Sequence, residues 1–339
     1  MVVKRKIYMK ILHLEKNAYD EESKRMIESL GNVDYLFCKN QADLTEIFEA
    51  KNYNVLFSRI GLDVNANVLS LAGHLKWIMS PTTGLDHIDL HYTEENKIKV
   101  ISLKGETEFL KNIHTTAEHT WALLLCITRK VSIAHNAVLK GLWSRGDYFC
   151  NELSGKKLGI IGYGRLGKIV AGYGTTFNMD VLVFDKLNRE NKIKDDRVKE
   201  CGLNELISKS DVISLHLPLN QSTHGFLSED RINLMKEGSI LINTARGGLI
   251  DEEALIKALG EGKIAGAALD VIADDSKWDG QVPSNHPVVE YAKRNDNLII
   301  TPHIGGYGYE SVFSTRRFLV KKFINSLNYS KSNLSINKV

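Results

Sequence analysis

A short glycine-rich segment is the feature of this sequence that points most directly to chemistry. Gly162, Gly164 and Gly167 have the spacing Gly-x-Gly-x-x-Gly and follow an apolar run, residues 157–161, that predicts a strand. The first glycine permits a tight turn, the second lets backbone amides approach a pyrophosphate, and the third lets the following helix pack closely on the strand. The N-terminus of that helix adds a partial positive charge. The spacing therefore predicts a dinucleotide-binding site.

An acidic residue stands where such a site needs one. Asp185 ends the next predicted strand, residues 181–184, and lies 18 residues after Gly167. A carboxylate about 20 residues beyond the glycines bonds the ribose hydroxyls and repels a 2′-phosphate, which favours NAD over NADP. Lys186 beside it weakens this preference. The alternative is a glycine-rich turn followed by a surface aspartate, but strand, helix and acid together favour the NAD site.

Six motifs between Trp143 and Gly306 resemble, in the same order, those of the D-2-hydroxyacid dehydrogenase family. They are Trp143-Ser144-Arg145, ELSGKKLGIIGYGRLGK, LHLPLNQST, INTARGGLIDEEAL, GAALDV and TPHIGG. The resemblance implies an α/β fold in which a Rossmann NAD-binding domain, residues 114–306, is inserted in a flavodoxin-like substrate domain. The substrate domain would comprise residues 1–113 and 307–339. The 3-phosphoglycerate dehydrogenase-like branch is the nearest resemblance.

The resemblance also implies a reaction, the interconversion of a D-2-hydroxy acid and its 2-keto acid. Arg246 matches the family's substrate arginine. Its planar guanidinium can hold the carboxylate and carbonyl oxygens of a 2-keto acid and stabilise charge developing on oxygen. His303 matches the catalytic histidine, which donates a proton in reduction and accepts one in oxidation. Taken alone, each would be an ordinary surface or loop residue, but the matched motifs favour the functional interpretation.

The third catalytic residue of the family is a glutamate that pairs with the histidine, five positions after the Asp of the Leu-Asp-Val motif. Here that Asp is Asp270, and the expected position holds Asp275, a carboxylate one methylene shorter. Asp275 can still favour the protonated imidazole of His303 if the backbone lies closer. Asp274 is the alternative partner. The sequence leaves the choice between these two aspartates open.

Further residues are assigned to the cofactor by the same resemblance. Leu217, Pro218 and Thr223 match a loop on the adenine side, and Asp270 matches a position near the nicotinamide. The full set of expected cofactor contacts is Gly162, Tyr163, Gly164, Arg165, Leu166, Gly167, Asp185, His216, Leu217, Pro218, Thr223, Thr244, Ala245, Arg246, Asp270, His303 and Gly305.

The substrate side of the site is expected in the first third of the chain. Arg59 resembles an arginine at a strand end that reaches the far end of the substrate, although a salt-bridged surface arginine is an equal alternative. Thr83 and Gly84 resemble a loop whose backbone amides bind a carboxylate. Together with Arg246, these residues form the expected substrate site.

No metal site is expected. The histidines show no ligand spacing such as His-Glu-x-x-His. Glu118 and His119 stand side by side on a predicted helix, but this stretch packs at the interdomain connector in the family, which favours a structural role for the pair.

Composition excludes several classes of protein. The 339 residues carry 44 Lys and Arg against 41 Asp and Glu, a net charge of +3 that is too balanced for a nucleic-acid-binding surface. No apolar run reaches the ~18 residues of a membrane span, and Met1–Lys6 does not precede an apolar stretch of signal-peptide length. The four cysteines form no Cys-x-x-Cys pair. These features predict a cytoplasmic protein with reduced thiols.

Alternating strands and helices predict two parallel sheets. The first set of predicted strands covers residues 7–14, 33–37, 53–57, 75–79 and 97–101, with helices at 21–30 and 41–50. The second set covers 157–161, 181–184, 211–216, 239–243, 265–271 and 298–301. One long helix over 115–140 is expected to connect the two, and a last helix is expected over 309–325.

The sequence therefore predicts an NAD-dependent oxidoreductase acting on a small D-2-hydroxy or 2-keto acid, with no nucleic-acid or membrane partner. The alternative is a non-catalytic NAD-sensing interaction protein of the corepressor kind on the same fold, because a fold does not fix a function. The family resemblance implies a homodimer through the nucleotide domains, and the apolar surface of the 115–140 helix, larger than one sheet face needs, supports it.

Overall fold

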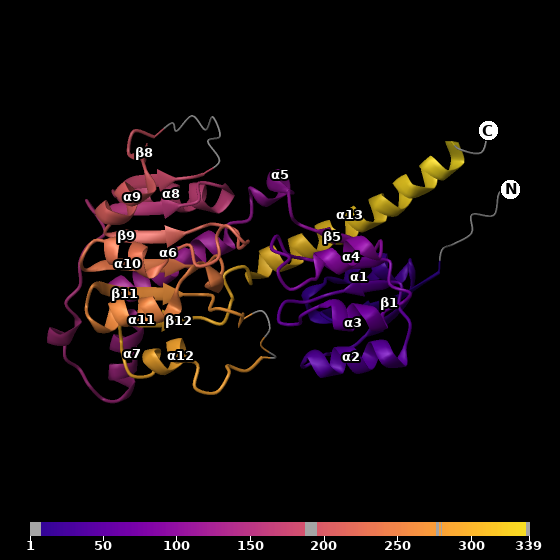
Figure 1. The fold of residues 1–339 in the computed structure, drawn as a ribbon, viewed down its shortest axis with the longest axis horizontal. Helices are drawn as coiled ribbons and strands as arrows, with labels where there is room; N and C mark the ends of the chain where they lie inside the picture. Colours follow the sequence, from indigo (N-terminus) through magenta and orange to yellow (C-terminus); the bar gives the residue numbers. More distant parts are fainter. Residues whose placement is uncertain (1–7, 187–194, 276–277, 279, 337–339) are drawn as a thin grey trace. The chain divides into compact units, whose positions relative to one another are not determined.

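The computed structural model describes residues 8–186, 195–275, 278 and 280–336 (Figure 1), and Met1–Lys6 lies outside these ranges. The chain forms two compact units. Unit 1 comprises Met1–Leu110, Ser276–Val282 and Gly308–Val339, and unit 2 comprises Lys111–Asp275 and Pro283–Tyr307. In the sequence, the two main segments of unit 1 therefore come before and after unit 2.

A five-stranded parallel sheet forms the centre of unit 1. Its strands are β1 (Met9–His13), β2 (Gly31–Tyr35), β3 (Val55–Phe57), β4 (Trp77–Ser80) and β5 (Lys99–Ser102). They pair in the order β2-β1-β3-β4-β5, with Ile11 opposite both Val33 and Val55. This is the strand order of flavodoxin-like folds. It confirms the predicted fold class for this unit.

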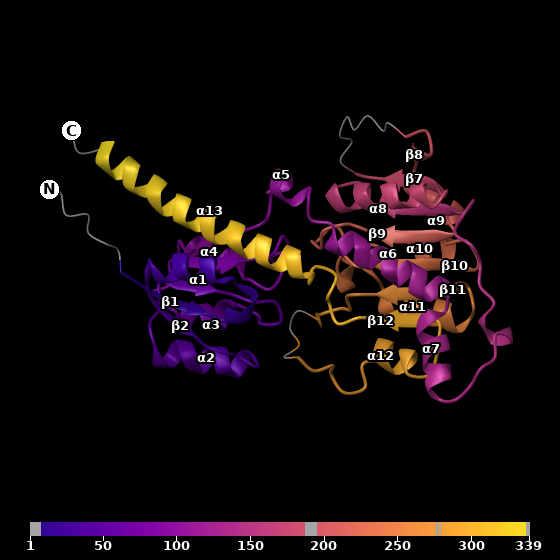
Figure 2. The ribbon, with the colours of Figure 1, turned by 180° about the vertical axis from the view of Figure 1, so that it is seen from behind.

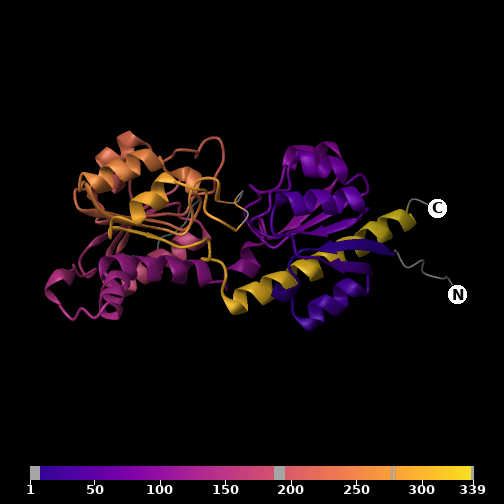
Figure 3. The ribbon, with the colours of Figure 1, turned by 90° about the horizontal axis from the view of Figure 1, so that it is seen from below.

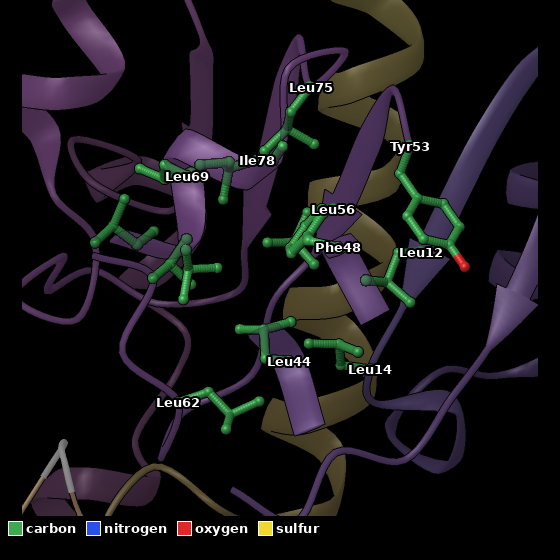
Figure 4. Close-up of a cluster of buried hydrophobic side chains, with 14 of the residues drawn as sticks. Leu12, Leu14, Leu44, Phe48, Tyr53, Leu56, Leu62, Leu69, Leu75 and Ile78 are labelled. Atoms are coloured by element: carbon green, nitrogen blue, oxygen red, sulfur yellow. The ribbon is translucent and has the colours of Figure 1, made fainter. Parts of the chain in front are cut away.

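Helices cover both faces of this sheet because alternate side chains of each strand point to opposite faces. Leu12, Leu56 and Ile78 face α2 (Gln41–Ala50), α3 (Ala66–Leu71) and α4 (Leu90–Glu95), as Figure 4 shows for the surrounding cluster. Ile11 and Phe57 face the opposite side, which α1 (Glu21–Glu28) and α13 (Tyr309–Ile336) cover. A short helix, α5 (Thr107–Leu110), ends the first segment of the unit.

Helix α13, at the end of the described chain, packs on α1 and on strands β4 and β5 of unit 1 (Figure 2). Leu319 and Phe323 are fully buried against the sheet. The guanidinium of Arg316, 7% exposed, donates to both carboxylate oxygens of Glu15 at 2.8 to 3.1 Å. A buried pair of this kind demands good geometry, and the two-pronged contact supplies it. The helix runs on to Ile336, beyond the end predicted at residue 325.

Seven parallel strands form the sheet of unit 2. They are β6 (Lys157–Ile161), β7 (Asp180–Phe184), β8 (Val198–Glu200), β9 (Val212–Leu215), β10 (Ser239–Asn243), β11 (Ile264–Leu269) and β12 (Leu298–Ile300). Their order is β12-β11-β10-β9-β6-β7-β8, so the chain reverses its direction of winding between β6 and β9. Ligands of open α/β sheets bind at the carboxyl ends of the strands at such a switch point. All of these strands except β8 were predicted.

Two sets of helices enclose this sheet on opposite sides (Figure 3). One face is covered by α6 (Thr115–Thr128) and α8 (Arg165–Thr176). The other is covered by α9 (Leu203–Lys209), α10 (Glu229–Leu234), α11 (Glu252–Gly260) and α12 (Pro287–Ala292). The apolar side chains between α6, α8 and the sheet include Trp121, Leu124, Ile160 and Val181.

The single long helix predicted over 115–140 is wrong. Helix α6 ends at Thr128, and a second helix, α7 (Val131–Leu139), starts after a bend of 62°. The bend lies at Lys130, whose φ of +54° is left-handed and incompatible with a continuous helix. Apolar periodicity runs through the break, so the pattern did not reveal it.

Within the part of the chain that the structure describes, no single helix is long and apolar enough to cross a membrane. The bent pair α6–α7 passes that test together by length and composition alone. Cys38, Cys126, Cys150 and Cys201 are all free thiols.

Candidate functional site

The glycine-rich loop after β6 brings backbone into close contact with two neighbouring segments. Gly162 has a φ of +98°, and a Cβ there would lie 2.5 Å from the carbonyl oxygen of His216. A Cβ at Gly167 would lie 2.1 Å from the carbonyl oxygen of Gly162. Any larger residue at either position would push the loop away from β9 or α8. These two contacts explain why the sequence needs glycine at both positions.

The middle glycine lies beside open space. Gly164 is the N-cap of α8, and a Cβ added to it would meet no atom within 4 Å. Helix α8 is 12 residues long, and its N-cap glycine provides no side chain to cap the helix. The amides at a helix N-terminus and the helix dipole together suit a pyrophosphate. The loop therefore fits the dinucleotide that the sequence predicts.

Side chains of the same loop face different surroundings. Tyr163 is half-buried with Lys168 above its ring, at 5.6 Å, and Leu166 packs into the core. The Nη1 group of Arg165 donates to the carbonyl oxygen of Ile113 at 2.8 Å, and burial lowers the pKa of this arginine. Arg165 therefore ties the start of α8 to the segment before α6.

Asp185 directly follows β7 and contacts the glycine-rich loop. Its Oδ2 atom accepts a hydrogen bond from the backbone amide of Tyr163 at 2.9 Å. The carboxylate is thus held beside the loop, at the position where an acid would bond a ribose.

The segment after β9 forms the other wall of the switch point. Burial lowers the pKa of His216 to about 4, and its Nε2 atom lies 2.9 Å from Ser214 Oγ, so the imidazole is neutral near pH 7. The side chain of Leu217 lies against Gly162. The hydroxyl of Thr223 donates to the carbonyl oxygen of Pro218 at 2.6 Å. These contacts give the loop a fixed conformation.

Asn243, at the end of β10, holds the loop that carries Arg246. It is fully buried, its Nδ2 donates to the carbonyl oxygen of Arg246 at 2.9 Å, and its Oδ1 accepts from the amide of Ala245 at 3.0 Å. Thr244 Oγ1 lies 2.7 Å from Thr120 Oγ1 of helix α6. Asn243 was not among the predicted site residues, although it belongs to the motif that contains Arg246.

His303 faces an aspartate across the ends of two adjacent strands. Its Nδ1 atom lies 3.0 Å from Asp275 Oδ2, with the two side chains 24% and 15% exposed. The distance is that of an ion pair, and the approach lacks the alignment of a hydrogen bond. The shorter side chain at position 275 therefore still reaches the histidine. Asp274 beside it has a φ of +60°.

The loop that carries Asp275 is held by the first residue of helix α11. The amide of Ala273 donates to Glu252 Oε1 at 2.7 Å. Burial raises the pKa of the Glu252 carboxyl, and the nearby charges of Asp274 and Asp275 add to the rise. A Cβ at Gly247 would lie 1.9 Å from the backbone of Ile272. The Arg246 loop and the Asp275 loop are consequently in backbone contact.

Asp270 lies beneath the histidine loop. The carboxylate is 1% exposed and accepts hydrogen bonds from Thr301 Oγ1 at 2.6 Å, from the amide of Ile304 at 2.9 Å and from the amide of Gly305 at 2.7 Å. Burial alone would raise the pKa of this carboxyl, but bonds from His119 and these groups outweigh it and hold the pKa below its usual range. Asp270 was predicted as a cofactor contact, and here its carboxylate anchors residues 301–305.

The predicted substrate residues of the first segment lie in unit 1, next to the carboxyl ends of β3 and β4. The guanidinium of Arg59 donates to the carbonyl oxygens of Cys38 at 2.5 Å and Ile60 at 3.0 Å, and it lies over the ring of Phe37. Thr83 is exposed. The carbonyl oxygen of Gly84 accepts from Thr82 Oγ1 at 2.6 Å.

Unit 2 thus gathers its predicted residues at one edge of one sheet. The residues around Gly162, Asp185 and His216 follow β6, β7 and β9, and Arg246, Asp275 and His303 follow β10, β11 and β12. Within the described ranges no group of three His, Cys, Asp or Glu side chains could hold a metal ion. The chemistry of this edge is that of a dinucleotide loop beside an arginine, a histidine and a carboxylate.

The sequence matches a known family over residues 121–305, described as "D-isomer specific 2-hydroxyacid dehydrogenase, NAD binding domain". It is 33% identical to a D-3-phosphoglycerate dehydrogenase of Archaeoglobus fulgidus over 280 residues, which are 82% of this chain and 50% of that protein. It is 33% identical to a hydroxypyruvate reductase of Thermotoga maritima over 274 residues, covering 81% of this chain and 85% of that protein.

The chain spans about half the length of the phosphoglycerate dehydrogenase that it matches. Among solved structures, it resembles a D-lactate dehydrogenase from Aquifex aeolicus, crystallised with NAD and lactic acid, with a TM-score of 0.78. That likeness has 30% sequence identity and covers 96% of each chain. On the sequence match, the fold and the site geometry together, this chain belongs to the D-isomer-specific 2-hydroxyacid dehydrogenase family and carries its NAD-binding domain.

Proposed function

We propose that this protein is an NAD-dependent oxidoreductase that interconverts a D-2-hydroxy acid and its 2-keto acid. The observation that carries the proposal is the contact between His303 and Asp275, 3.0 Å long, at the sheet edge that also holds the dinucleotide loop and Arg246. A protein that only bound NAD would have no need of a carboxylate paired with a histidine beside a substrate-binding arginine. The phosphoglycerate-like branch remains the proposed substrate class.

Each residue has a defined task in the reduction direction. When bound, NADH supplies the hydride that adds to the carbonyl carbon. Arg246 holds the carboxylate and carbonyl oxygen of the keto acid and stabilises the charge that develops on that oxygen. His303 donates its proton to the same oxygen, which completes the hydroxy acid. Asp275 stabilises the protonated imidazole before the transfer and fixes the orientation of the ring.

The cofactor would be held by the loop after β6, with the pyrophosphate at the N-terminus of α8 and the ribose at Asp185. Unit 2 would then be the nucleotide domain and unit 1 the substrate domain, to which Arg59, Thr83 and Gly84 contribute. Four free thiols suit a reducing compartment, and we propose the cytoplasm as the location.

The proposed reaction is tested with NADH and a panel of 2-keto acids that includes glyoxylate, pyruvate, hydroxypyruvate and 3-phosphohydroxypyruvate. The wild type should oxidise NADH with at least one of them.

His303→Ala should lower kcat by about 10²–10⁴-fold, because it removes the general acid, and should leave NADH binding intact by fluorescence titration. Arg246→Lys should be nearly as damaging as Arg246→Ala, because lysine keeps the charge and loses the two-pronged contact. NADH binding without turnover of any acid would support the NAD-sensing alternative instead.

The pH dependence should report the contact between Asp275 and His303. Reduction needs a proton on His303 before the substrate binds, so kcat/KM for reduction should fall as the pH rises. Asp275→Asn removes the negative charge beside His303, and the fall in kcat/KM should then move to lower pH. Asp275→Glu retains the charge and should keep the wild-type profile. A shift in Asp274→Asn, with none in Asp275→Asn, would assign the pairing to Asp274.

Asp185 should set the preference between the two nicotinamide cofactors. Asp185→Ala removes the negative charge beside the ribose, so NADH should bind more weakly and the preference for NADH over NADPH should narrow. The measurement is kcat/KM for each cofactor with one keto acid. Asp180→Ala, an exposed aspartate at the start of the same strand, is the matched control. An unchanged NADH/NADPH ratio in Asp185→Ala would show that another group selects the cofactor.

An apolar surface on unit 2 suits association with a second copy of this chain. Helix α7 has no buried residue, and Leu139, Trp143 and Phe149 are 72%, 90% and 86% exposed. Val131, Val138 and Leu142 are exposed in the same segment. An apolar surface of this extent marks an interface, and a two-fold axis would pair it with itself. We propose a homodimer through this α7 surface.

Light scattering at micromolar concentration should give about twice the chain mass of 38.1 kDa. Trp143→Glu places a charge in the α7 surface and should shift the protein toward the monomer, because the charge would be buried without a partner. Leu90→Glu, at a 40% exposed leucine of unit 1, should leave the mass unchanged. A wild type of single-chain mass would contradict the proposed dimer.

A further inference from the structure

His119, on helix α6, reaches the group that anchors the histidine loop. Its Nε2 atom lies 3.0 Å from Thr301 Oγ1 and 3.2 Å from Asp270 Oδ1, and its side chain is 17% exposed. A Cβ at Gly305 would lie 2.7 Å from Asp270 Oδ2 and 3.5 Å from the His119 ring. Glycine at 305 therefore leaves room for the loop to close over this pair.

The loop that His119 supports is held in an unfavourable conformation. His303 has a φ of +54°, in the left-handed region that is unfavourable for residues other than glycine. The backbone carbonyl of Asp270 accepts from the amide of His303 at 2.8 Å, and its carboxylate accepts from the next two amides. These bonds hold His303 in the conformation that directs Nδ1 to Asp275.

The anchor works only if the carboxylate of Asp270 stays charged and in place. A buried carboxylate needs hydrogen bonds or a positive partner to remain ionised. His119 supplies such a contact from a different element, so it joins helix α6 to the ends of β11 and β12. The next residue, Thr120, contacts Thr244 in the Arg246 loop. Two successive residues of one helix thus contact the two loops that carry Arg246 and His303.

We propose that His119 is a positioning residue for His303, acting through Asp270 and Thr301. This assignment rests on the proposed function, because it takes His303 as the proton donor. His119 itself touches neither substrate nor cofactor in this account. It fixes the hydrogen bonds that keep residues 301–305 in place, so that the imidazole of His303 meets the reacting oxygen at a constant distance.

The test combines a structural and a kinetic measurement on three variants. His119→Leu keeps an apolar side chain of similar volume and removes the contact with Asp270. His119→Gln restores a donor at the position of Nε2. His91→Leu is the control, because the exposed imidazole of His91 faces Glu95 in unit 1 at 3.5 Å. The readouts are amide hydrogen exchange of the 301–306 segment, kcat with the best keto acid, and the dissociation constant of NADH.

In His119→Leu, the loop should open more easily because Asp270 loses one of the contacts that hold it in place. Exchange of the Ile304 and Gly305 amides should therefore speed up by about tenfold or more. Turnover should fall by on the order of tenfold to a hundredfold, because a small misplacement of a catalytic group has effects of this size. NADH binding should stay unchanged, and His119→Gln should restore most of the exchange protection and of kcat. His91→Leu should behave as the wild type.

Unchanged exchange of residues 301–306 in His119→Leu would overturn the proposal. Faster exchange that extends equally to strand β6 would also overturn it, because it would show a general loss of stability. Failure of His119→Gln to restore kcat would remove the hydrogen-bonding role. If the wild type turns over no keto acid, the proposed function fails, while the exchange measurement still decides whether His119 fixes the loop.

Discussion

The parallel direction of all seven strands in unit 2 is the constraint on which the site depends. A parallel sheet delivers every loop that follows a strand to the same edge, whatever the distance between the strands in the sequence. Gly162 and His303 are separated by about 140 residues, yet each lies in a loop that follows a strand of this sheet. The reversal between β6 and β9 then leaves the glycine-rich loop against His216 instead of against a crossover helix. Residues that are far apart in the sequence therefore lie together at one edge of this sheet.

The sequence was sufficient for features that local backbone geometry dictates. The strands before Gly162 and Asp185 could be predicted. Each is a short apolar run, one followed by a glycine-rich turn and the other by an aspartate, and this combination has few other interpretations. The motifs around Arg246 and His303 predicted the strand ends that carry them. Whether Asp274 or Asp275 reaches His303 could not be predicted, since the answer depends on the left-handed backbone of Asp274 and on a hydrogen bond from the loop to Glu252 at the start of α11.

Other features arise from tertiary contacts that leave no periodic trace. The bend at Lys130 interrupts an apolar pattern that continues on both sides of it. Asn243 and Asp270 are buried polar groups whose partners are mostly backbone amides and carbonyls. Backbone partners have no sequence signature, so a pattern identifies the residue and says nothing of its contacts. The polar support beneath the site was therefore the part hardest to foresee.

Because α13 completes the core of unit 1, this unit can finish folding only after unit 2 has been synthesised. Ile11 and Phe57 belong to a sheet face whose covering side chains include Leu319 and Phe323 of a helix that begins nearly 200 residues after Leu110. At 5–20 residues per second, roughly 10–40 s separate the two segments on the ribosome. Unit 2 is fully synthesised within that interval, since its last residue, Tyr307, precedes the helix. The nascent chain therefore carries an apolar sheet face that α1 covers only in part until α13 emerges, and this exposed part is where a chaperone would be needed.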